Sequence, residues 1–129
     1  MSYVTDYPPA AADIAAAHYQ LKLSLETDCA DVYAEMQQGH PDFVLLHVVG
    51  SSETFLRCHI PGAIHFHHAD ISPERLSAWH ADTLFVVYCA GPHCNGADRA
   101  ALKISQLGRP VKLMIGGLTG WQDEGFALA

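Results

Sequence analysis

The sequence predicts one α/β domain built on a central, mainly parallel sheet with helices on both faces. Strand and helix patterns alternate along the chain, and the apolar runs at residues 43–49 and 84–88 lack the alternation of half-buried strands. The length of 129 residues suits a single hydrophobic core. In sheets of this kind, ligands gather beyond the carboxyl ends of the strands, so we expect functional residues directly after strands.

The N-terminal segment, residues 1–26, reads as an extension of the domain formed by residues 27–129. An alanine-rich stretch from residue 10 to about 18 favours a helix, and Pro9 suits its first turn. Three leucines then alternate with polar residues: Leu21, Leu23 and Leu25. This period indicates an edge strand, although a continuing helix fits nearly as well. We expect the helix to be a packing element and the contact of a homodimer.

The remaining elements are each bounded by turn residues or helix caps. Asp28 and Ser72 can accept hydrogen bonds from first-turn amides, and Pro73 suits a helix start. The expected order is a helix at 28–38, a strand at 43–49, one or two helical turns at 52–57, a strand at 62–66, a helix from Ser72, a strand at 84–88, a helix at 97–107, a strand at 111–115, and a final short helix after Gly116-Gly117.

Cys89 directly follows the buried strand predicted at 84–88 and begins the segment that leads into the next helix. The unpaired amides and the dipole of a helix start favour negative charge, so a thiol at such a junction tends to ionise more readily than a free thiol. The thiolate is the reactive form of cysteine. We therefore predict that Cys89 is the catalytic nucleophile; the simpler alternative is a small buried apolar side chain.

The loop after Cys89 carries a second thiol, Cys94, among other loop residues: Ala90, Gly91, Pro92, His93, Asn95 and Gly96. Its glycines allow the backbone to bend around an anion. Cys94 can serve as a resolving or relay thiol, or equally can pack inward. Arg99, in the following helix, is a candidate for anion support, although a solvated side chain is the simpler interpretation. His93 is interpreted as an exposed loop histidine in preference to a proton relay.

Charge and composition exclude several classes of function. Seven basic and fourteen acidic residues give a net charge of −7, with no basic stripe, so nucleic acid and anionic membranes are not expected partners. Neither a signal peptide nor an apolar run of about 18 residues is present, and we expect a soluble, cytoplasmic protein. In a reducing cytosol, four cysteines do not indicate disulfides.

The histidines near residue 65 do not form a convincing metal site. Alternation along a strand points His65 and His67 one way and His68 the other. A zinc site built on Cys89, Cys94 and His93 lacks a fourth ligand at suitable spacing. We therefore predict no metal and no cofactor.

Three motifs in order resemble those of the rhodanese-like domain family. They are His59-Ile60-Pro61-Gly62-Ala63-Ile64, the Val86-Val87-Tyr88-Cys89 strand end with its alanine-bearing helix, and Gly116-Gly117-Leu118-Thr119-Gly120-Trp121. The resemblance spans residues from about 27 to 126. It implies a sulfurtransferase fold whose loop amides converge on Cys89. That cysteine would carry a sulfane sulfur as a persulfide, taken from a small donor and passed to a thiol acceptor.

The loop departs from the family pattern in two ways. It contains no arginine, and the pair Ala100-Ala101 falls about two positions later than usual, which implies a wider pocket. Thiosulfate, a dianion that profits from a guanidinium, is therefore not the expected preferred donor. The alternative function is a non-catalytic or redox-sensing binding module that uses Cys89 and Cys94. Phosphatase or arsenate reductase chemistry is the least favoured, since it relies on an arginine.

Overall fold

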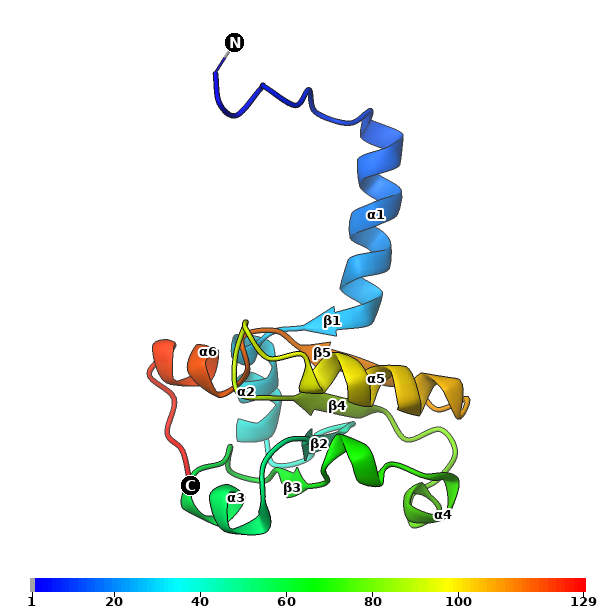
Figure 1. Cartoon of the computed structure of the whole chain (residues 1–129), viewed down its shortest axis with the longest axis vertical. Coiled ribbons are helices and arrows are strands. Elements are labelled where there is room, and N and C mark those ends of the chain that lie inside the picture. Colours follow the sequence, from blue (N-terminus) through cyan, green and yellow to red (C-terminus); the bar gives the residue numbers. More distant parts are fainter. Residues whose placement is uncertain (1) are drawn as a thin grey trace.

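The computed structural model describes residues 2–129 and contains one five-stranded sheet in which every pairing is parallel (Figure 1). The strands lie in the order β1-β5-β4-β2-β3. Their bounds are β1 Glu26–Thr27, β2 Val44–His47, β3 Ile64–His65, β4 Phe85–Tyr88 and β5 Val111–Met114. Helices flank the sheet, so the predicted fold class is confirmed.

Three of the six α-helices in the described residues begin at a residue whose side chain caps them. The bounds of the helices are α1 Ala12–Leu25, α2 Cys29–Gln37, α3 Ser52–Arg57, α4 Pro73–Leu76, α5 Gly96–Gln106 and α6 Gly117–Asp123, with a 3-10 turn, η1, at His68–Asp70. The side chains of Asp28, Ser51 and Ser72 each accept the backbone N–H three residues later. The caps predicted at Asp28 and Ser72 are confirmed.

The sheet is covered on both faces by separate apolar clusters. Because neighbouring residues of a strand point to opposite faces, Phe85 and Val87 pack on the α4 and α5 side, whereas Val86 and Tyr88 pack on the α2 and α6 side. All four residues of β4 are buried. Trp121 of α6 is also buried, as expected for a core residue. The central strand β4 is therefore held rigidly, and the loop that follows it has a fixed base.

The strand predicted from the alternating leucines is wrong. The helix α1 continues through them to Leu25, and β1 is reduced to two residues. Ala, Leu and Lys are strong helix formers, and three alternating positions are a weak strand signal. Figure 1 shows α1 projecting away from the sheet at the β1 edge, so residues 21–25 have no neighbouring strand to pair with.

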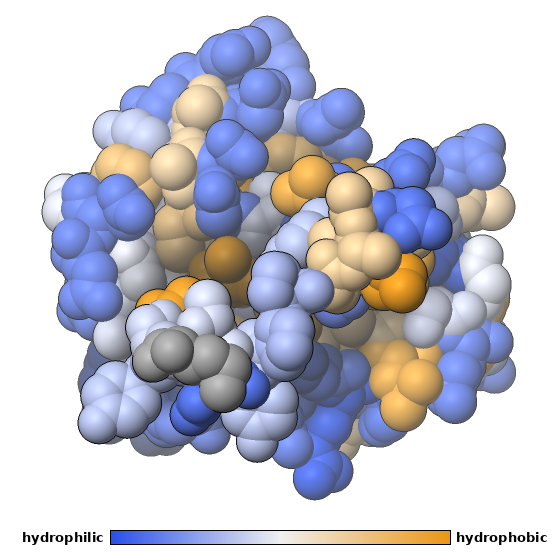
Figure 2. Space-filling view, turned by 90° about the horizontal axis from the view of Figure 1, so that it is seen from above, coloured by the Kyte–Doolittle hydropathy of each residue, from blue (hydrophilic) through white to orange (hydrophobic). Residues whose placement is uncertain are grey.

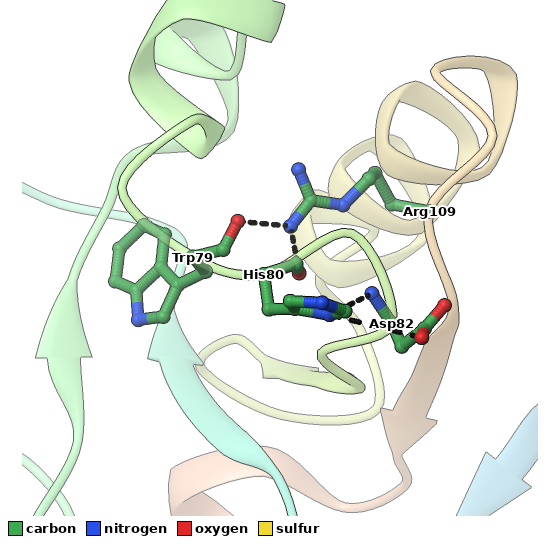
Figure 3. Close-up of polar contacts among 4 residues, drawn as sticks. All are labelled: Trp79, His80, Asp82 and Arg109. Carbon is green, nitrogen blue, oxygen red and sulfur yellow. Dashed lines mark hydrogen bonds and ion pairs between the residues drawn. The ribbon is translucent and has the colours of Figure 1, made fainter.

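Arg109 fixes the segment that leads into β4. Its Nη1 donates to the carbonyl of Leu76 at 3.2 Å, and its Nη2 donates to the carbonyls of Trp79 at 3.1 Å and His80 at 2.7 Å (Figure 3). The guanidinium also lies 5.3 Å from the ring centroid of Phe85. A lysine could not reproduce this fork of donors. Arg109 thus anchors the amino end of the central strand.

His47 and Tyr88 form a buried polar pair on the other face of the sheet. The Tyr88 hydroxyl accepts the N–H of Ile60 at 3.2 Å, so its own proton is available for His47 Nδ1, which lies 2.7 Å away. This arrangement requires neutral His47. Burial lowers the His47 pKa from 6.5 to about 4, with smaller contributions from His65 and His59.

The His47 pKa predicts acid sensitivity of the fold. The unfolded chain takes up a proton near pH 6.5, whereas folded His47 resists protonation to about pH 4, so the free energy of unfolding should fall as the pH is lowered between these values. The full effect is roughly 3 kcal/mol. Urea unfolding of the wild type and His47→Gln across this range should show a flatter pH dependence in the variant. His40→Gln, at an exposed position, is the control, and equal slopes in all three proteins would refute the assignment.

Candidate active site

A pocket of about 200 Å³ lies at the carboxyl edge of the sheet, beside the loop that follows β4. It is lined by Cys89, Gly91, Pro92, Cys94, Ala97, Asp98, Leu113, Met114, Ile115, Gly116 and Gly117. The structure thus brings the two loop thiols into one pocket. Asn95 and His93 are exposed and are not among the lining residues.

The turn after β5 closes one side of this pocket. Gly116 and Gly117 both have positive φ angles, of 90° and 59°. A side chain at Gly117 would collide with the Cys89 carbonyl and come within 2.9 Å of the Gly91 nitrogen. The backbone N–H of Leu118 donates to the Cys89 carbonyl at 3.0 Å. From the sequence, these glycines were not predicted to belong to the site. The usable signal was their position directly after β5, the strand that pairs with β4.

The Cys89 thiol is buried and donates toward carbonyl oxygens. It is 5% exposed, with Sγ 3.3 Å from the Cys94 oxygen. Burial raises its pKa, and the neighbouring Cys94 raises it further, while the backbone amides of Ala97 and Gly91 oppose the rise. The expectation that Cys89 ionises more readily than a free thiol is therefore wrong for the reduced protein. The physical reason is that burial of the thiol outweighs the opposing effect of the Ala97 and Gly91 amides.

Cys94 occupies the position that favours a thiolate. Its Sγ accepts the backbone N–H of Gly96 at 3.5 Å, and this interaction is the main cause of a lowered pKa, with the Ala90 amide and the Cys89 thiol acting in the same direction. Partial burial and the Asp98 carboxylate act against it. Of the two thiols, Cys94 is therefore the one that ionises first as the pH rises.

Gly96 makes this arrangement sterically feasible. A side chain there would collide with Val49 and would lie 3.5 Å from Cys94 Sγ and 3.6 Å from Cys89 Cβ. The absence of a side chain lets the first turn of α5 approach both thiols. The contribution of the Ala97 amide was not predicted from the sequence, although its place in the first turn of a helix was a usable signal.

Arg99 is turned toward its own helix and loop. Its Nε donates to Asn95 Oδ1 at 3.1 Å, both residues are exposed, and neither lines the pocket. The carboxylate of Asp98 lines it instead. A role for Arg99 in anion support stays a prediction.

The remaining candidate groups have structural roles. Cys29 is buried beneath the Gly116 turn, donates to the Ile115 carbonyl at 3.5 Å, and has a pKa raised to about 11, mainly by burial. His59 Nδ1 lies 2.7 Å from the Phe55 carbonyl, so this side chain bonds to the backbone. Among residues 2–129, no three His, Cys, Asp or Glu side chains gather closely enough to hold a metal ion.

The site thus consists of two free thiols in a pocket at the carboxyl edge of a parallel α/β sheet. The family model described as the rhodanese-like domain matches residues 28–124, and the chain belongs to this family.

Solved structures agree with this assignment. The BH2092 protein of Bacillus halodurans is 35% identical, with a TM-score of 0.87 over 92% of this chain and 86% of its own. The rhodanese-like domain of the Anabaena Alr3790 protein, 24% identical, has a TM-score of 0.70 over 81% and 77%. A thiosulfate sulfurtransferase from Pseudomonas aeruginosa, 21% identical, has a TM-score of 0.59 over 82% of this chain and 19% of its own. The latter two show the shared fold.

No curated protein sequence matches the chain at a significant level. Within residues 2–129, none of the helices combines the length and apolar character needed to cross a membrane.

The two thiols should differ in reactivity toward alkylation. Iodoacetamide labelling, mapped by mass spectrometry across pH, should modify Cys94 at lower pH than Cys89, because the pKa of Cys94 is lowered and that of Cys89 is raised. The thiols also influence each other. Cys94→Ser should therefore lower the pKa of Cys89, and Cys89→Ser should raise that of Cys94. Labelling of Cys89 at lower pH than Cys94 in the wild type would contradict this order.

Gly117→Ala should disrupt the pocket. The added methyl group meets the Cys89 carbonyl at a positive φ, so we expect a loss of about 2 kcal/mol or more in the free energy of unfolding. Gly125→Ala is a matched control, because Gly125 also has a positive φ but no atom within 4 Å of the added carbon. Urea unfolding of both variants separates the collision from backbone strain. Equal losses of unfolding free energy in the two variants would show that the collision with the Cys89 carbonyl does not destabilise the protein.

Proposed function

We propose that the chain is a sulfurtransferase-like protein that carries a sulfane sulfur as a persulfide on Cys89 and passes it to a thiol acceptor. The observation that carries this proposal is the enclosure of Cys89 beside a second, more acidic thiol, with the Ala97 amide facing its sulfur. Membership of the rhodanese-like family supports the reaction type. A structural neighbour named as a thiosulfate sulfurtransferase points in the same direction.

The pair of thiols supplies the nucleophile without an external base. The Cys94 thiolate accepts the proton of Cys89, and Cys89 Sγ then attacks the outer sulfur of a donor R–S–SH. The S–S bond of the donor breaks, and R–S⁻ leaves with the bonding electron pair. In the second half-reaction an acceptor thiolate attacks the outer sulfur and the Cys89 thiolate leaves. Each half-reaction conserves the number of S–S bonds, so neither needs an oxidant.

The charges around the pocket favour a donor with no anionic group next to its reacting sulfurs. No lining residue is basic, Asp98 is among the lining residues, and its carboxylate opposes ionisation of Cys94. A dianion such as thiosulfate would lie near this carboxylate without a guanidinium to bind it. An alkyl persulfide does not require such a partner. We therefore propose low-molecular-weight persulfides as the donor class.

Sulfur loading tests the proposal. The purified protein is incubated with thiosulfate, 3-mercaptopyruvate or glutathione persulfide, and the mass of one added sulfur is located by peptide mass spectrometry. Glutathione persulfide should load Cys89 at least about tenfold faster than thiosulfate. Cys89→Ser should abolish loading at this position. Cys94→Ser should slow it by roughly tenfold at neutral pH, because burial, the main cause of the raised Cys89 pKa, remains while the base is lost.

Cys58→Ser is the matched control, because Cys58 is a half-buried thiol that does not line the pocket. Failure of every donor to load Cys89 would refute the sulfurtransferase proposal. The same pair of thiols also favours a second function, a redox-sensing module. Peroxide would then convert the two thiols into a Cys89–Cys94 disulfide, with its oxygens released as water, and no donor would add sulfur.

A further inference from the structure

The helix α1 is apolar on two opposite faces and is not buried by the rest of the chain. None of its 14 residues is buried, and its large apolar side chains are more than half exposed. At helical spacing, Ile14, Leu21 and Leu25 share one face, whereas Tyr19 and Leu23 lie on the opposite face. Exposed apolar faces of this kind mark interaction surfaces. The isolated chain therefore leaves α1 without its packing partners.

The total accessible surface leads to the same conclusion. The chain exposes 8176 Å². A compact monomer of 14.0 kDa would expose about 6,700 Å², so the surplus is roughly 1,500 Å². A stable protein interface buries about 800 Å² on each partner. The surplus is large enough for such an interface, and its sources are the projecting α1 and the exposed segment 2–11 that precedes it (Figure 1).

A complementary groove lies at the base of α1. It has a volume of about 260 Å³ and is lined by Leu25, Glu26, Asp98, Ala101, Leu102, Ser105, Val111 and Leu113. The groove exists because β1 is only two residues long and leaves β5 poorly covered. Leu102 of α5 is 57% exposed at its margin. Figure 2, which looks down on the α1 end of the molecule, shows apolar side chains exposed among polar ones on this face.

We propose that two copies of this chain form a two-fold dimer by exchanging α1. The two helices pair antiparallel through the Ile14 and Leu21 face, so the amino end of each helix lies at the groove beside Leu102 of the partner. The same surfaces serve both copies, so the assembly closes.

Length fits a second copy as the occupant. A helix of 14 residues is about 21 Å long, so the tip of one α1 reaches the base of the other. The match to the Bacillus halodurans protein covers 92% of this chain. The residues outside the match are fewer than the 14 residues of α1, so part of the projecting helix has a counterpart in that protein.

The oligomeric state of the full chain tests the proposal. Light scattering coupled to size exclusion should give twice the chain mass of 14.0 kDa. The double variant Ile14→Glu with Leu21→Glu should weaken the dimer at least about 30-fold. Both residues are exposed in the single chain, so circular dichroism should show an intact fold. Leu56→Glu is the control, since Leu56 is 75% exposed on α3, outside the proposed interface.

A separate variant tests the groove. Leu102→Glu should also weaken the dimer, because the substitution places a carboxylate where the amino end of the partner's α1 packs. A dimer that survives Leu102→Glu would refute the exchange, and one that survives the α1 double variant would refute the helix pairing. A wild-type chain that stays monomeric at several hundred micromolar would refute the whole proposal. So would binding of the monomer, through α1, to phosphatidylglycerol vesicles.

Discussion

The candidate site depends on one close backbone contact, between Gly117 and the segment from Cys89 to Gly91. No side chain fits between them, and the amides of Leu118 and Thr119 donate to the first two carbonyls of the loop, each at 3.0 Å. Parallel pairing of β4 with β5 brings the two segments to the same edge of the sheet. The contact fixes where the loop starts, and so determines where the Cys89 sulfur lies.

Burial and backbone amides shift the pKa values of the two thiols in opposite directions. Cys89 lies deeper, so loss of solvent raises its pKa in spite of the Ala97 amide, whereas Cys94 receives the Gly96 amide with little burial. Because the thiols are neighbours, each proton transfer changes the other site, and the pair titrates as a unit. Amides thus supply the stabilisation of charge that an arginine side chain would otherwise give. This division of roles suits a nucleophile that ionises only when its proton moves to Cys94.

Local patterns in the sequence predicted most elements because their causes are local. The continuous apolar runs gave β2 and β4, and the cap residues gave α2 and α4. The alternating leucines misled, since a strand needs a neighbour that the sequence does not show. The sequence also could not predict which of Cys89 and Cys94 has the lower pKa, because this depends on which backbone amide faces which sulfur. The hydrogen-bond partner of His47 could not be predicted without the sheet register, which aligns His47 with Tyr88 on the neighbouring strand.

The groove of the proposed dimer and the pocket that contains Cys89 have two lining residues in common. Asp98 and Leu113 line both the groove beside α1 and the pocket that contains Cys89. Asp98 already opposes ionisation of Cys94, and it does so while exposed to solvent. A helix seated in the groove would remove part of that solvent, and a lower local dielectric strengthens the repulsion between carboxylate and thiolate. Dimer formation through α1 would therefore raise the pKa of Cys94, and the same contact that buries the exposed helix would adjust the base of the thiol pair.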